Sequence, residues 1–279
     1  MNLLGIDFED WYHPDLIQRN ISSKNNEPRV INGIDKILEL LRKNETYATF
    51  FVVGELLEHK IELLDKIIEE GHEIGFHTMY HTRLDTPGFK NLFDDELKRF
   101  AVLTNNKSKG FRAPTFSLNH ASSWAIDVLL DNGYVYDSSV VPTKVNMYGI
   151  ANAELKPYKI TNSRLGKNDP SGKLIEFPLL ITKFLGKKIP ACGGFYLRTL
   201  PKKVIINAIN NYEKKGMPAT MYIHSWELTP EHMPKIFLPF KDSFITYHNL
   251  DKALPRMEEI LEKYDFTSFE RYISTMKLN

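Results

Sequence analysis

Two histidines at a spacing of four residues are the most informative chemical feature of the sequence. His77 and His81 follow the run Glu73–Phe76, which is predicted as a short strand. On a helical turn this spacing places both imidazoles on one side, where they can bind one divalent metal. No glutamate adjoins His77, so the pattern of the zinc-dependent proteases is absent. Because α/β folds place their sites at strand ends, we favour a metal site over a pair of incidental surface histidines.

Three carboxylates stand close together at the end of the first predicted strand. Asp7, Glu9 and Asp10 directly follow an apolar run. In an extended chain Asp7 and Glu9 share a face, whereas Asp10 turns onto the following loop. Acidic side chains in such a place are costly unless they meet a cation or solvent. The group therefore offers a third metal ligand, and its alternative is an exposed acidic loop that caps the next segment.

The elements that must position these residues alternate between strands and helices. The predicted strands and ordered runs are Met1–Phe8, Tyr47–Val53, Glu73–Phe76, Lys109–Arg112, Tyr134–Tyr136, Leu174–Leu180 and Ala219–Ile223. The predicted helices are Val30–Leu41, Leu57–Ile68, Asp94–Leu103, Ser122–Leu130, residues 201–215 and Leu250–Leu261. Such alternation favours a largely parallel sheet or barrel with helices outside. The polar stretch Pro142–Asp169 is predicted to be a surface excursion.

Composition limits the classes of protein and partner. The 279 residues include 36 Lys+Arg against 35 Asp+Glu, so the formal net charge is only +1. No overall field favours nucleic acid or an anionic membrane, and an anionic partner would need a local basic patch. Cys192 is the single cysteine, which excludes an intrachain disulfide and a thiolate zinc cluster and leaves this thiol a structural role.

The sequence contains no run of about 18 apolar residues, so no membrane span is expected. Met1–Phe8 lacks the basic and apolar regions of a signal peptide, and we expect a cytoplasmic protein. Internal repeats and linkers are also absent from the sequence. We therefore expect a single domain over residues 1–279.

Several motifs resemble those of the metal-dependent polysaccharide deacetylases of carbohydrate esterase family 4. The runs Ala48–Gly54 and Gly71–His77, with His81, are similar in order and spacing. Phe111–Ser117 resembles the family's Arg-x-Pro segment, and Ile223–Glu227 resembles its late histidine motif. Further likenesses are Tyr136–Ser139, Glu176–Pro178, Gly193–Arg198 and Tyr247–Leu250. Together they span nearly the whole chain and point to the branch involved in bacterial surface and exported polysaccharides.

The acidic segment departs from the family pattern, which opens with Thr-Phe-Asp-Asp. One alignment makes Glu9 and Asp10 the equivalents of the adjacent pair, with the first as base and the second on the metal. The other makes Asp7 the base and leaves Glu9 or Asp10 on the metal. We favour Asp7 as base and Asp10 as ligand beside the two histidines, and Glu9 belongs to the catalytic group without a settled role.

The resemblance also implies roles for later residues. His224 would protonate the leaving group, and Arg112 would orient the base carboxylate. The backbone N–H of Thr115 would stabilise the oxyanion. The residues expected to line the substrate groove are Pro114, Thr115, Phe116, Tyr196 and Trp226. Each has a plain structural alternative: a surface ion pair for Arg112, a core histidine for His224, and simple packing for Trp226.

The resemblance implies a distorted (β/α) barrel of about seven strands, with a branch-specific C-terminal extension from about residue 225. Phe237–Tyr247 is expected to cross the surface, and the last helix to pack on the barrel. The expected activity is metal-dependent removal of an N-acetyl group from an amino sugar of a bacterial polysaccharide or of its lipid- or nucleotide-linked precursor, such as an O-antigen or capsule unit.

We expect zinc as the metal, with cobalt, nickel, iron and manganese also compatible with a two-histidine, one-carboxylate set. The alternatives are a deformylase or cyclic-amide hydrolase on the same fold, or a non-catalytic glycan-binding module. A serine hydrolase is disfavoured because no Gly-x-Ser-x-Gly elbow is present.

Overall fold

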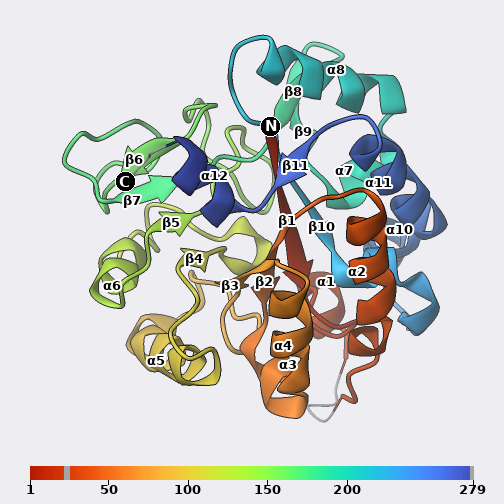
Figure 1. Ribbon diagram of the computed structural model, residues 1–279, viewed down its shortest axis with the longest axis horizontal. Helices are drawn as coiled ribbons and strands as arrows, with labels where there is room; N and C mark the ends of the chain where they lie inside the picture. The colour runs from red at the N-terminus through yellow and green to blue at the C-terminus, as the bar shows by residue number, and fades with distance from the viewer. Residues whose placement is uncertain (22–25, 277–279) are drawn as a thin grey trace.

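The structure is a computed structural model that describes residues 1–21 and 26–276. Its main feature is a curled sheet with helices on the outside (Figure 1). Parallel strands follow one another in the order β10 (Thr220–His224), β1 (Asn2–Phe8), β2 (Thr49–Val52), β3 (Glu73–Phe76), β4 (Gly110–Phe111), β5 (Tyr136–Asp137) and β7 (Leu174–Glu176). These seven parallel strands confirm the predicted distorted α/β barrel.

Four further strands complete the β-structure around the barrel. β6 (Tyr158–Ile160) pairs antiparallel with β7, and β11 (Phe266–Thr267) pairs parallel with the start of β1. β8 (Ile181–Phe184) and β9 (Lys187–Pro190) form a separate hairpin.

Irregular chain bridges the gap between β7 and β10. The Leu180 N–H donates to the Thr220 carbonyl at 2.9 Å, and the Tyr222 N–H donates to the Cys192 carbonyl at 2.7 Å. These bonds satisfy backbone groups that an open edge would leave unpaired. The barrel is therefore closed by single hydrogen bonds rather than by a continuous ladder, which explains its distortion.

Amphipathic helices cover the outer face of the sheet. They are α2 (Ile34–Lys43), α3 (Gly54–His59), α4 (Glu62–Glu69), α5 (Phe93–Leu103), α6 (Ala125–Asp131), α7 (Gly194–Thr199), α8 (Lys202–Glu213) and α11 (Ala253–Leu261). Three further helices, α1 (Asp15–Gln18), α9 (Ser225–Leu228) and α10 (Phe240–Tyr247), lie near the carboxyl ends of β1 and β10. The 3₁₀ turns are Val30–Gly33, Phe89–Asn91, Pro114–Phe116, Pro230–His232 and Leu250–Lys252.

The last helix, α12 (Phe269–Met276), closes the amino end of the barrel. The backbone N–H of Phe269 donates to the Thr49 hydroxyl at the start of β2. The Phe269 ring stacks on Tyr136 and contacts Phe51 and Phe177 inside the barrel. Because successive strand residues alternate sides, these inward rings fill one half of the barrel and leave the carboxyl end for polar groups.

Several predicted elements need correction. The helix predicted over Leu57–Ile68 is two helices, α3 and α4, that separate at Lys60. The predicted surface excursion Pro142–Asp169 contains β6 and buried side chains such as Leu165. Helix α11 is not the last one, because α12 follows it. The segment expected to cross the surface carries α10 in its second part.

None of the described helices has the length and apolar character that crossing a bilayer requires.

Candidate metal and catalytic site

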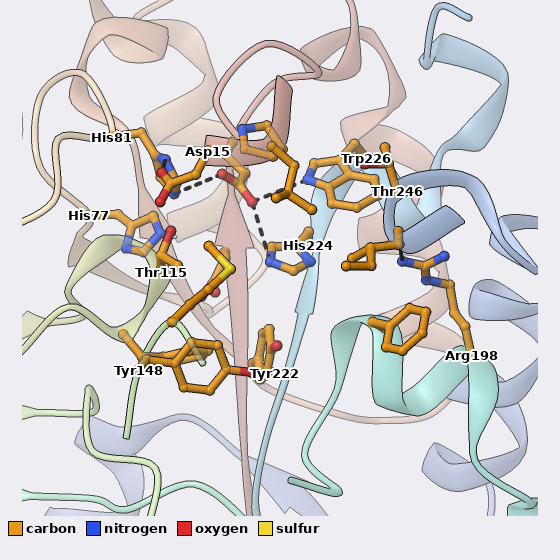
Figure 2. Close-up of a pocket in the computed structure, with 18 residues that line it drawn as sticks. Asp15, His77, His81, Thr115, Tyr148, Arg198, Tyr222, His224, Trp226 and Thr246 are labelled. Carbon is orange, nitrogen blue, oxygen red and sulfur yellow. Dashed lines mark hydrogen bonds and ion pairs between the residues drawn. The ribbon is translucent and has the colours of Figure 1, made fainter. Parts of the chain in front are cut away.

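The polar groups gather where the parallel strands end. Asp7 of β1 is in register with His224 of β10 and with Phe51 of β2. His77 directly follows β3, and Arg112 directly follows β4. Figure 2 shows His77 and His81 on one side of the pocket and His224, stacked on Trp226, on the other. Parallel pairing therefore brings residues from distant parts of the chain to one edge.

Glu9, His77 and His81 form a group able to hold a metal ion. One ligand atom from each lies within 4.8 Å of the others, and all three residues are buried. Glu9 Oε2 lies 3.0 Å from His81 Nε2, yet it accepts no hydrogen bond from any residue that the structure describes. Two atoms bound to one tetrahedral cation at about 2.1 Å stand about 3.4 Å apart, a little more than the 3.0 Å between these two atoms. This carboxylate oxygen and the two imidazoles therefore fit a divalent metal.

His77 is oriented for metal binding by the chain itself. Its Nδ1 donates to the Arg112 carbonyl at 2.7 Å, which leaves Nε2 as the free ligand atom. Burial lowers the pKa of His77 to about 4, despite the nearby carboxylate of Asp7. A neutral imidazole is the form that binds a metal.

His81 sits on a strained backbone beside Glu9. Its φ is 55°, and that of Thr78 on the same turn is 59°. The pKa of His81 would fall through burial alone, but the Glu9 carboxylate outweighs this and raises it. The histidines also act on Glu9: burial alone would raise the pKa of its carboxyl group, but they outweigh it and hold this pKa far below its usual value. Left-handed φ values at non-glycine residues cost energy and are typical of functional sites.

The structure places Asp10 away from the predicted ligand role. Its carboxylate accepts hydrogen bonds from the backbone N–H groups of Arg29, Val30 and Ile31, at 2.8–3.2 Å. These are orphan donors at the start of a 3₁₀ turn, and a carboxylate is a good cap for them. Glu9, for which the sequence left the role open, takes the place beside the histidines.

Asp7 and Arg112 form a buried ion pair next to this group. Arg112 Nη1 donates to Asp7 Oδ1 at 2.7 Å, and the guanidinium also binds the carbonyl and the hydroxyl of Ser138. The side chain is fully buried and lies over the Phe51 ring at 4.1 Å. A Cβ on Gly5 would overlap this guanidinium, so β1 needs glycine there. The surface ion pair considered for Arg112 is thereby excluded.

His224 belongs to a chain of charged groups that the sequence did not reveal. Its Nδ1 donates to Glu227 Oε2 at 2.6 Å, and Glu227 Oε1 accepts from Arg198 Nε at 2.5 Å. Burial would lower the pKa of His224, but Glu227 and then Glu9 outweigh it and raise the pKa to about 9. His224 Nε2 lies 3.4 Å from Glu9 Oε1. Its imidazolium therefore holds a proton at neutral pH at the edge of the candidate metal group.

The predicted groove residues are only partly brought together. Thr115, Phe116 and Trp226 line the pocket. Pro114 is buried at the start of its 3₁₀ turn and is not among the lining residues, and Tyr196 packs on the hydrophobic core. The lining residues that sequence reasoning missed include Asp15, Tyr148, Phe195 and Thr246. For Phe195 the available signal was the motif Gly193–Arg198, which contains it.

Backbone strain also marks the turn after β4. Thr115 has φ 50° and ψ 29°, and Phe116 has φ 50°. This conformation is rare for a β-branched residue such as threonine. Both residues line the pocket. Trp226, another lining residue, donates from Nε1 to Glu9 Oε1 at 3.2 Å.

Two family profiles match most of the chain between them. Residues 30–136 match the family described as polysaccharide deacetylase, and residues 138–274 match a domain of unknown function (DUF3473). The chain is 34% identical over 88 residues to a peptidoglycan-N-acetylglucosamine deacetylase of Bacillus cereus, which is 31% of this chain and 41% of that protein. It is 40% identical over 97 residues to a chitooligosaccharide deacetylase of a Bradyrhizobium species, which is 33% of this chain and 42% of that protein. The matched regions thus cover less than half of these relatives.

Solved structures share the fold at low identity. A crystal structure assigned to a polysaccharide deacetylase from Mycobacterium smegmatis has a TM-score of 0.60 and 15% identity, covering 99% of this chain and 91% of that one. A 4-alpha-glucanotransferase from Thermococcus litoralis has a TM-score of 0.56 and 15% identity, covering 98% of this chain and 40% of that one. At such identity the likeness extends to the barrel and its layers, and not to the activity.

Proposed function

Because the chain belongs, through residues 30–136, to the polysaccharide deacetylase family, we propose that it is a metal-dependent hydrolase that removes an N-acetyl group from an amino sugar. The substrate is a bacterial polysaccharide or its lipid- or nucleotide-linked precursor in the cytoplasm. The single observation that carries the proposal is the buried group Glu9, His77 and His81, which faces a protonated histidine across one pocket.

Glu9, His77 and His81 would hold the metal, with zinc as the first choice and cobalt, nickel, iron or manganese as alternatives. When bound, a divalent cation supplies an acidified water and a polarised acyl carbonyl. Asp7 accepts a proton from the attacking water at its carboxylate, which Arg112 holds in place. Arg112 also carries the carbonyl that fixes the ring of His77, so one buried residue orients both groups.

His224 supplies the proton that the leaving amine needs. Its Nε2 faces the pocket while Nδ1 donates to Glu227, so the ring is held in one orientation. Glu227 is held in turn by Arg198, which keeps the carboxylate charged despite its burial. A general acid of this kind contributes about 10²–10⁴-fold to a rate. The Thr115 backbone N–H is the proposed donor to the oxyanion, because the residue lines the same pocket.

The experiment compares wild type with His77→Ala for bound metal and for acetate release. We expect close to one metal equivalent in wild type and little in the variant, with acetate released from N-acetylated amino sugars by wild type alone. His120→Ala changes an exposed histidine and is the matched control.

Three results would redirect the proposal. Release of formate from formylated sugars, or opening of cyclic amides, with no acetate release would indicate one of the two alternative hydrolases. Glycan binding without turnover by the metal-loaded protein would indicate a binding module. An equal metal content in wild type and His77→Ala would show that the metal site is not this one.

A further inference from the structure

Two phenylalanines project almost completely into solvent beside the pocket. Phe237 is 95% exposed and Phe240 is 88% exposed, the two highest fractions among the large apolar side chains of the described chain. The two residues lie three positions apart with Pro239 between them, at the start of α10. Full exposure of two aromatic rings so close together is unfavourable in water and indicates a partner.

The loop that carries these rings is fixed to the body of the protein. The Tyr247 hydroxyl donates to the Pro234 carbonyl at 3.0 Å and accepts from the Ile236 N–H at 3.1 Å. Met233 and Leu238 of the same loop are buried in a cluster with Trp226. The exposed rings therefore belong to a loop that Met233, Leu238 and the Tyr247 hydroxyl anchor to the body of the protein.

Positive charge flanks the rings and negative charge is absent between them. The nine residues Met233–Lys241 include two lysines, Lys235 and Lys241, and no acidic residue. Both lysines are exposed, and no salt bridge among the described residues engages either of them. The next acid, Asp242, is already paired with Arg19. We call Lys235, Phe237, Phe240 and Lys241 the Phe-Lys surface.

We propose that the Phe-Lys surface docks on a lipid bilayer that contains anionic headgroups. Aromatic rings enter the boundary between headgroups and acyl chains, and lysines beside them are attracted to anionic lipid. A sugar-binding platform needs both donors and acceptors next to the ring to bind hydroxyl groups, and the lysines of the Phe-Lys surface supply donors alone. A twofold dimer through it would place the lysines of each copy near those of the other.

Docking would bring the bilayer close to the candidate active site. Ile245 and Thr246, which line the pocket, lie on the same short helix as Phe240. At 1.5 Å per residue, Phe240 and Ile245 are about 8 Å apart along the helix axis. This inference concerns the location of the protein and does not rest on the proposed function.

The test is co-sedimentation with phosphatidylcholine vesicles, with and without phosphatidylglycerol. Wild type is expected to sediment with the anionic vesicles, and less so in high salt. Phe237→Ser/Phe240→Ser should weaken the partition into them by about tenfold or more, and Lys235→Gln/Lys241→Gln should remove most of the salt dependence. Circular dichroism confirms that each variant is folded.

A matched control changes two other exposed apolar residues. Leu92→Ser/Val102→Ser alters side chains that are 57% and 78% exposed at α5, which lies across the molecule from α10 in Figure 1. This variant should bind vesicles as wild type does. The proposal is overturned if wild type does not sediment with anionic vesicles, or if the serine variant at 237 and 240 sediments equally well. It is also overturned if light scattering shows a dimer that this variant abolishes while vesicle binding is unchanged.

Discussion

Glu9 and Asp10 are neighbours in the chain, yet their carboxylates meet different surroundings. Glu9 faces two imidazoles, whereas Asp10 accepts bonds from backbone N–H groups of the segment Arg29–Ile31. Their side chains point apart because β1 ends at Phe8 and the chain turns. One residue is therefore suited to hold a cation and the other to hold a loop.

Conservative amide substitutions separate the two roles. Glu9→Gln should lose most of the bound metal, because an amide is a poorer ligand than a carboxylate. Asp10→Asn should keep the metal and lower the free energy of unfolding by about 1–2 kcal/mol, because both carboxylate oxygens accept backbone N–H groups and an amide has only one acceptor oxygen. Metal analysis and urea denaturation measure the two effects. Loss of metal in Asp10→Asn with retention in Glu9→Gln would reverse this assignment.

Glu227 is predicted to act on turnover through His224. Glu227→Gln removes the charge that keeps the His224 imidazole protonated, so kcat should fall by about tenfold or more while metal content stays unchanged. The exposed Glu231, which pairs with Lys36, provides the matched control Glu231→Gln. Since Arg198 loses a partner as well, folding of the variant is checked first. An unchanged kcat would remove His224 from its proposed role.

At the scale of elements, the alternation of strands and helices could be predicted from apolar periodicity. The predicted strand Glu73–Phe76 coincides with β3, and the predicted strand over Ala219–Ile223 with β10 shifted by one residue. The His77–His81 pair was evident because its spacing is local. Helix α12 was missed because its apolar face packs inside the barrel end, against rings that lie far away in sequence.

The parts of the site that depend on long-range contacts could not be predicted from the sequence. The choice between Glu9 and Asp10 depends on where the loop around Val30 lies, and no local pattern determines this. The pairing of Arg198 with Glu227 joins α7 to α9, elements separated in the chain by α8 and β10. The resemblance to a family supplied Arg112 and His224, and the structure supplied their partners.

Glu73, where β2, β3 and α12 meet, should make the stability of the fold depend on pH. Glu73 is fully buried, and burial raises its pKa to about 7 even though Thr49, Tyr136 and the Glu270 N–H donate to its carboxyl group. Between about pH 4.5 and pH 7 the folded protein therefore holds a proton that the unfolded chain releases. This contribution stabilises the fold at low pH and is lost as the pH rises toward 7.

Glu73→Gln should remove this dependence. The free energy of unfolding of the wild type should fall as the pH rises from 5 to 8. This fall should exceed that of the variant by an amount on the order of 3 kcal/mol. Chemical denaturation at a series of pH values measures it, with the exposed Glu69→Gln as the matched control. Parallel curves for wild type and Glu73→Gln would show that the group stays ionised in the folded state.

For the whole molecule, the barrel is closed at one end by rings and open at the other to the pocket. Phe269→Ala would leave a cavity among Phe51, Tyr136 and Phe177 and should cost about 3–5 kcal/mol in the free energy of unfolding. Phe240→Ala, at an exposed site, should change it by less than about 0.5 kcal/mol. Thermal and urea denaturation compare the two. A cost below about 1 kcal/mol for Phe269→Ala would mean that α12 does not seal the barrel end.

The overlap between a Cβ at position 5 and the guanidinium of Arg112 has an evolutionary consequence. A mutation that gives position 5 a side chain would force this buried guanidinium to move away from its partners, which favours a change of the arginine as well. Homologous chains should therefore show the two positions changing together. A chain with alanine or a larger residue at position 5 would have to move or give up the arginine that holds Asp7 and the ring of His77. The absence of a single methyl group could thus distinguish, within an alignment, the descendants that kept this arrangement of Asp7, Arg112 and His77 from those that abandoned it.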